Sequence, residues 1–196
     1  MKKGLIITLV IVFVILVFIF QGIGMYNSLV KSEEAVNAQW ANVENVYQRR
    51  ADLIPNLVNT VKGYANFEQK TLTDVIEARA KATSVQINPE KLDEASLQKF
   101  QAAQDGLSSA LARLMVVVER YPDLKANQNF LELQSQLEGT ENRIAVERRK
   151  FNEMAQAYNT NIRTFPRNIF ASMFGFEKKA YFQAAEGAET APKVEF

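Results

Sequence analysis

A long apolar segment at the amino terminus dominates this sequence. Between Leu5 and Phe20 every residue except Thr8 is apolar, and no charged residue occurs from Gly4 to Val30. A helix from Gly4 to Met25 would be about 33 Å long, and the hydrocarbon core of a bilayer is about 30 Å thick. The segment is rich in Val, Ile and Phe, but in lipid every backbone group must be satisfied within its own helix. We therefore predict a transmembrane anchor over residues 1–25.

A cleaved signal peptide is the alternative to a retained anchor. Gly22-Ile23-Gly24 supplies two small residues, but the apolar segment is long for a signal peptide and an Ala-x-Ala site is missing. Lys2 and Lys3 precede the segment, whereas Lys31 is the single basic residue soon after it. The positive-inside rule then predicts a cytoplasmic amino terminus and an extracytoplasmic bundle, in a single-pass protein of the cell (inner) membrane.

The composition excludes several classes of activity. The chain has 196 residues with neither Cys nor His, so thiolate, imidazole and Ser-His-Asp chemistry are impossible. Metal sites in helical bundles use Glu-x-x-His pairs, which cannot occur here. Lys+Arg is 23 and Asp+Glu is 22, so the chain has no large net positive charge that would attract the phosphate backbone of a nucleic acid. A hydrolase that uses two carboxylates would need a cleft that a narrow bundle does not offer. We expect no enzyme activity, no cofactor, no small-molecule substrate and no nucleic acid.

The remainder of the chain has the spacing of long helices. From about residue 26 to residue 85, apolar residues recur in two rows at seven-residue spacing, which is typical of a coiled-coil seam. Pro55 is expected to kink this first helix without ending it. One row is Leu29, Val36, Val43, Arg50, Leu57, Tyr64 and Thr71, and the other is Tyr26, Glu33, Trp40, Tyr47, Ile54, Val61, Glu68 and Val75.

Two more long helices and a short one follow. Asn88-Pro89-Glu90 has the pattern of a capped helix start, and Tyr121-Pro122-Asp123 predicts the end of that second helix. The third helix begins near Asn127, and Pro166 ends it or starts a fourth that closes at Gly175. Its buried row is Phe130, Leu137, Ile144, Phe151, Tyr158 and Phe165.

We therefore predict an all-α fold. A transmembrane helix continues into an antiparallel bundle of three long helices and a short carboxy-terminal one. The predicted units are the anchor at 1–25, the bundle at 26–182 and a flexible tail at 183–196.

The predicted helix lengths leave part of the first helix uncovered. A second helix of about 48 Å, starting at the far end of a first helix of about 90 Å, cannot reach the membrane. The stretch from Tyr26 to Tyr47 would then expose an apolar stripe, so we expect it to pair with other copies or with another membrane protein. The stripe is Leu29, Val36, Trp40, Val43 and Tyr47. Alternatively, the first helix breaks at Pro55 or Gly63 and folds back.

Two clusters are candidate sites. The first comprises Arg49, Arg50, Asp52, Pro55 and Asn56. We expect it either to bind an anion or a partner, or to form a structural network with the turn from Tyr121 to Phe130, with Arg50 partly buried and paired.

The second cluster is aromatic and lies near the carboxyl end. It comprises Phe170, Phe174, Phe176, Tyr181 and Phe182, with Lys178 and Lys179 among them. This composition is typical of an interfacial amphipathic segment or a docking surface. The predicted third helix rises away from the membrane, which favours a partner, but a first helix that folds back would place the segment on its own bilayer. Capping of the bundle end is the structural alternative.

Several runs of residues resemble the LemA family of bacterial membrane proteins. The runs are Tyr26-Asn27-Ser28-Leu29-Val30, Trp40-Ala41-Asn42-Val43, Arg49-Arg50-Ala51-Asp52-Leu53-Ile54-Pro55-Asn56-Leu57-Val58, Tyr121 to Phe130, Leu137 to Ala145, Tyr158-Asn159 and Phe174-Gly175-Phe176. One departure is Phe67-Glu68, where similar proteins tend to have His-Glu. The resemblance implies a single-pass anchor and an all-helical bundle, and it implies no settled biochemical function.

These features together favour a membrane-anchored, non-enzymatic helical scaffold at the cell envelope. Its partners would be the lipid bilayer and either further copies of the chain or another membrane protein. The alternative is a sensory or adaptor bundle that relays a signal through a partner membrane protein.

Overall fold

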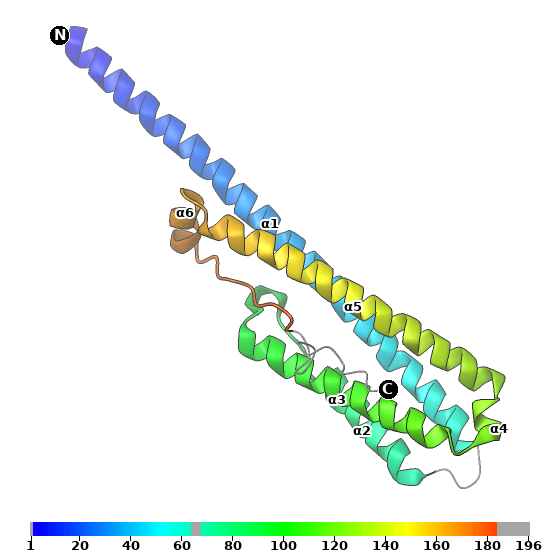
Figure 1. Cartoon of the computed structure of the whole chain (residues 1–196). Coiled ribbons are helices and arrows are strands. Elements are labelled where there is room, and N and C mark those ends of the chain that lie inside the picture. The colour runs from blue at the N-terminus through cyan, green and yellow to red at the C-terminus, as the bar shows by residue number, and fades with distance from the viewer. Residues whose placement is uncertain (1, 64–67, 184–196) are drawn as a thin grey trace, which may run out of the picture.

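The computed structural model describes residues 2–63 and 68–183, which are entirely helical or irregular and contain no strand (Figure 1). The predicted all-α fold is confirmed. Tyr64, Phe67 and the predicted tail from residue 184 onward lie outside the described residues. The helices are α1 (Lys2–Lys62), α2 (Gln69–Ser84), α3 (Glu94–Val118), the short α4 (Pro122–Lys125), α5 (Gln128–Arg163) and α6 (Arg167–Phe174), with a 3₁₀ turn, η1 (Pro89–Lys91), before α3.

Helix α1 joins the apolar segment to the bundle without a break. It has 61 residues, which corresponds to a rod about 90 Å long. Its amino-terminal part extends alone beyond the bundle (Figure 1). In the part of the chain that the structure describes, α1 is the one helix long and apolar enough to cross a membrane.

The chain reverses direction directly after α1. The residue spacing predicts a first helix that runs to residue 85 and therefore a later reversal. That prediction is wrong, and the alternative of a fold-back at Gly63 is correct, because α1 ends at Lys62 and α2 begins at Gln69. Glycine is a poor helix former, so a helix loses little by ending there. Helices α2 and α3 then form a hairpin beside α1, and α4 turns the chain near the far end of α1 (Figure 1).

Helix α5 returns along α1 toward the membrane end and covers the stripe that was predicted to lack a partner. Leu29, Val36, Trp40 and Val43 are fully buried and Tyr47 nearly so, in a core cluster shared with α5. Because α4 lies at the tip of α1, the 36 residues of α5, about 54 Å of helix, suffice to reach the level of Leu29. The expectation of an uncovered stripe was therefore wrong, because these side chains are buried within the chain and offer no surface for self-association.

Most of the predicted helix ends are confirmed. Asn127 accepts a hydrogen bond from the backbone N–H of Phe130 at 3.0 Å and caps α5, and Gly175, with φ of 77°, closes α6. Asn88 caps the η1 turn, whereas Asp93 caps α3 through Ser96, so the predicted start of the second helix was too early. Phe165 is 77% exposed because α5 ends two residues before it.

Pro55 is accommodated inside α1 by a contact from α2. A proline has no N–H, so the carbonyl of residue 51, one turn earlier, loses its helical donor. Ala51 is buried, and its carbonyl oxygen instead accepts a 2.7 Å hydrogen bond from Nε of Arg79. The proline therefore creates the acceptor by which α2 is held against α1.

This arrangement predicts that Arg79 and Pro55 are energetically coupled. Arg79→Ala should lower the free energy of unfolding by about 1–3 kcal/mol, because it leaves a buried carbonyl unsatisfied. In a Pro55→Ala background the same change should cost less than half as much, since residue 55 would then donate to Ala51. Chemical denaturation of the full chain in detergent measures both, with the exposed Arg113→Ala on α3 as a control. Equal costs in the two backgrounds would contradict the proposed coupling.

Candidate functional site at the membrane-proximal end of the bundle

Helix α6 packs against α1 where the apolar segment enters the bundle. A Cβ atom at Gly22 would lie 3.2 Å from Cε1 of Phe170, so the glycine permits this approach. The Tyr26 ring meets the rings of Phe174 and Phe176 edge-on, with centroids 5.0 and 5.9 Å apart. The end of the bundle is thereby fixed to the base of the predicted anchor.

The outer side of this junction is apolar and exposed. Ile169, Met173 and Phe174 on α6 are each more than half exposed, as is Phe165 just before it. An apolar groove of about 600 Å³ separates α1 from α6, and its walls are lined by Val14, Ile15, Phe18, Ile19, Gly22, Ile23, Tyr26, Phe170 and Phe174. Because apolar surface of this extent is unfavourable in water, the junction has the character of a lipid-facing or protein-facing surface.

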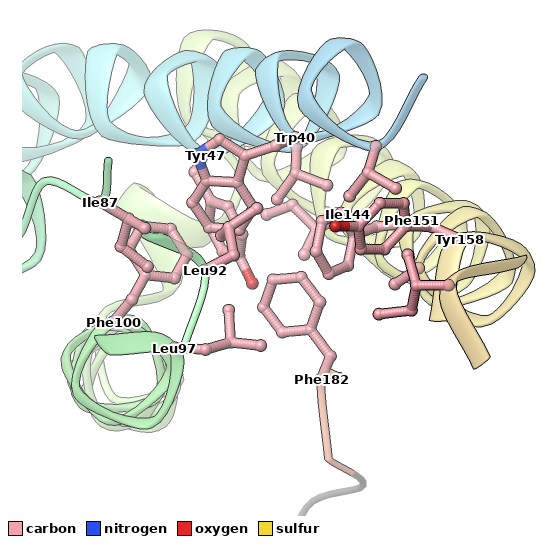
Figure 2. Close-up of a cluster of buried hydrophobic side chains, with 14 of the residues drawn as sticks. Trp40, Tyr47, Ile87, Leu92, Leu97, Phe100, Ile144, Phe151, Tyr158 and Phe182 are labelled. Carbon is pink, nitrogen blue, oxygen red and sulfur yellow. The ribbon is translucent and has the colours of Figure 1, made fainter. Parts of the chain in front are cut away.

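The aromatic cluster predicted near the carboxyl end is divided between two environments. Phe170, Phe174 and Phe176 lie at the junction, whereas residues 177–183, which we call the strap, leave it in an irregular, extended path along the bundle. Phe182 on the strap is buried in the core, 6.0 Å from Trp40 and 5.5 Å from Phe151 between ring centroids (Figure 2). Treating all five residues as one interfacial segment was therefore wrong.

Two asparagines of α5 hold the strap by its backbone. The side-chain amide of Asn159 donates to the carbonyl of Lys179 at 2.8 Å, and its oxygen accepts from the N–H of the same residue at 3.0 Å. Asn152 makes the same pair of bonds with Phe182, at 3.0 and 2.9 Å. These bonds satisfy the backbone of a segment that has no regular secondary structure of its own.

Lys179 is a buried cation at the centre of this region. Its ammonium lies 2.9 Å from a carboxylate oxygen of Glu33 on α1 and 2.9 Å from the carbonyl oxygen of Glu90. Burial raises the pKa of the neighbouring Tyr158 hydroxyl, and the charge of Glu33 raises it further, so this tyrosine stays neutral. Glu33 was predicted from its spacing as a polar seam residue, and its pairing with Lys179 had no signal in the sequence.

The first candidate cluster is divided in the same way. Arg50 is 2% exposed and donates to Glu141 at 2.8 Å, Ser108 at 2.8 Å and the side-chain oxygen of Gln104 at 2.7 Å. It therefore joins α1 to α3 and α5, and the expected burial and pairing are confirmed. Arg49, Asp52, Pro55 and Asn56 are exposed on the outer side of α1.

For Arg50, the expected network with the turn from Tyr121 to Phe130 is wrong, because its hydrogen bonds go to side chains of α3 and α5. That expectation placed the turn beside residues 49–55, but α3 descends alongside α2 to the tip of α1. Leu124 and Phe130 accordingly share a core cluster with Val58 and Val61, while Arg120 pairs with Glu68 at 3.1 Å. Arg50 faces the middle of α3 and α5 instead.

The Arg50 network predicts unequal effects for its two charged members. Arg50→Met should lower the free energy of unfolding by about 3 kcal/mol, because the buried oxygens of Gln104 lose their charged donor. Glu141→Gln should cost no more than about 1 kcal/mol, since the Glu141 side chain is 56% exposed. Denaturant titrations of both variants and the parent chain test this. A loss at Glu141 as large as that at Arg50 would mean that the ion pair, rather than the buried amide contacts, provides the stability.

The fold and this junction define a class: a helical bundle whose first helix carries a long apolar extension at its amino end. The profile of the LemA family matches residues 39–196, and the chain belongs to this family. It is 26% identical to Protein LemA of Metamycoplasma hominis, over 87% of this chain and 74% of that protein. It is also 29% identical to Magnetosome protein MamQ 2 of Paramagnetospirillum magneticum and 28% identical to Magnetosome protein MamQ of Magnetospirillum gryphiswaldense, in each case over 84% of this chain and 67% of the relative.

Proposed function

We propose that this protein is a membrane-anchored, non-enzymatic scaffold that binds other proteins, including further copies of itself, at the membrane surface. The observation that carries the proposal is the continuity of α1 from Gly4 in the apolar segment to Lys62 at the far end of the bundle. A single helix about 90 Å long keeps one direction over its whole length. With its apolar segment in a bilayer, the bundle would stand at a fixed height and orientation, as a scaffold requires.

The junction between α1 and α6 supports this arrangement. Exposed apolar side chains of Ile169, Met173 and Phe174 continue the apolar surface of the anchor, and Arg167 and Lys178 lie beside them in the sequence. Apolar residues flanked by basic ones are typical of helices that lie in the membrane interface. In this proposal α6 rests at the headgroup level and acts as a collar that braces the bundle against the bilayer.

The non-enzymatic assignment rests on residue chemistry. The chain has no thiol and no imidazole, and its most buried cations, Arg50 and Lys179, are paired with structural groups. The exposed Arg49, Asp52 and Asn56 form a polar surface on the outer side of α1, where we place contacts with partner proteins. From the Lys2 and Lys3 bias, we place the amino terminus in the cytoplasm and the bundle outside.

The collar makes a prediction about depth in the bilayer. Because the chain has no native cysteine, Met173→Cys can carry a single environment-sensitive dye in the full chain. In lipid vesicles its emission should shift to the blue and be quenched by lipids with a quencher on the acyl chain. Ser135→Cys, exposed near the start of α5, serves as the matched control and should respond as it does in water. Equal responses at the two positions would contradict an interfacial α6.

The scaffold also makes a prediction about size. The full chain, purified in mild detergent, should form assemblies larger than a single chain of 22.2 kDa, as measured by light scattering with the detergent subtracted. Size should not change in Val36→Ala, because that residue is buried within the chain. A monomer at every concentration tested would remove self-association from the proposal.

A further inference from the structure

The strap is bound as an extended peptide is bound in a groove. Asn152 and Asn159 are seven residues apart on α5, about 10.5 Å along the helix. Lys179 and Phe182, whose backbones they hold, are three residues apart, about 10 Å in an extended chain. Two turns of helix therefore match three residues of strap, so both asparagines reach the backbone at once.

Side-chain pockets add selectivity to these backbone bonds. At one end Glu33 and the carbonyl oxygens of η1 receive the Lys179 ammonium, and at the other Trp40 and Phe151 enclose the Phe182 ring. Arg148 covers the outer face of that ring, with Cζ 4.7 Å from its centroid. Backbone bonds that give affinity and pockets for particular side chains that give specificity are the elements of peptide recognition by extended segments.

The walls of this groove do not include the strap itself. Glu33 and Trp40 come from α1, the two asparagines and Phe151 from α5, and Leu92, whose carbonyl accepts from the N–H of Ala180 at 2.9 Å, from the segment before α3. Helices α1 and α5 and the segment before α3 thus build a complete receptor, and the strap fills it from beyond Gly175, a residue in the left-handed conformation.

We propose that this groove also binds the strap of a second copy of the chain, so that two copies exchange straps reciprocally. An exchanged strap makes the same bonds as the resident one, so the cost is largely that of bringing two chains together. Two copies anchored in one membrane already share a plane and an orientation, which raises their effective concentration. This inference rests on the proposed self-associating scaffold and names the segment that would link its copies.

Disulfide trapping between two tagged copies tests the exchange. The donor copy carries Gln183→Cys with Asn152→Ala, so that its own groove holds a strap weakly. The acceptor copy carries Gln101→Cys with Phe182→Ala, so that its groove is intact and its own strap is weakened. Nε2 of Gln101 lies 3.1 Å from the carbonyl oxygen of Gln183, so the two positions are neighbours when a strap is seated, and a single chain that carries both cysteines checks that they form a disulfide.

In vesicles that hold both full-length copies, mild oxidation should give a donor–acceptor disulfide several-fold more abundant than with an acceptor that carries Ser135→Cys in place of Gln101→Cys. Adding Phe182→Ala to the donor should remove that excess. Circular dichroism checks that each variant keeps its helices. If Phe182→Ala unfolds the acceptor, an acceptor with Phe182 intact replaces it and should trap the same disulfide by reciprocal exchange.

No excess over the Ser135→Cys acceptor, in either acceptor background, overturns strap exchange. An assembly larger than one chain by light scattering, combined with that result, also overturns it, while self-association through another surface stands. A monomer by light scattering together with no trapped disulfide overturns both the exchange and the self-association.

Discussion

The pairing of α1 with α5 is the constraint on which the rest of the structure depends. Helix α1 is about 90 Å long, and its apolar stripe from Leu29 to Val61 cannot remain in water. In the part of the chain that the structure describes, α5 is the one long helix that begins at the tip of α1 and runs back toward the membrane end (Figure 1). Once the two are paired, α6 must lie at the base of the anchor, and the α2–α3 hairpin must occupy the side that remains.

Three cationic side chains then connect elements that apolar packing alone would leave weakly joined. Arg79 reaches from α2 to the carbonyl that Pro55 leaves free on α1. Arg50 reaches from α1 to both α3 and α5, and Lys179 ties the strap to α1 and η1. Each meets fixed oxygen acceptors inside the bundle, and such contacts are directional. They therefore specify how each helix is rotated about its own long axis. Apolar stripes alone define that rotation only loosely.

The membrane end of the molecule combines two surfaces of opposite character. On one side, α6 and the anchor present an exposed apolar groove, suited to lipid. On the other, the strap closes an aromatic core around the single tryptophan, Trp40. The short link between them begins at Gly175, where φ of 77° favours glycine. Any movement of α6 in the bilayer would thus be transmitted to the strap. The link connects the proposed collar to the proposed point of exchange.

The sequence by itself determined the all-α class, the long apolar segment and several of the helix ends. Apolar residues at seven-residue spacing identified the buried row from Phe130 to Tyr158, and the caps at Asn127 and Gly175 identified two helix ends. Both signals can be read from the sequence because periodicity and capping are properties of neighbouring residues. Only the tertiary structure decided which helix covers which stripe. The choice between Pro55 and Gly63 as the point of reversal depends on Arg79, which lies 28 residues away from its acceptor. The ion pair between Lys179 and Glu33 likewise joins residues that are far apart in the sequence. Neither residue identifies the other as its partner, because such pairs form only after the chain has reversed direction and brought them together.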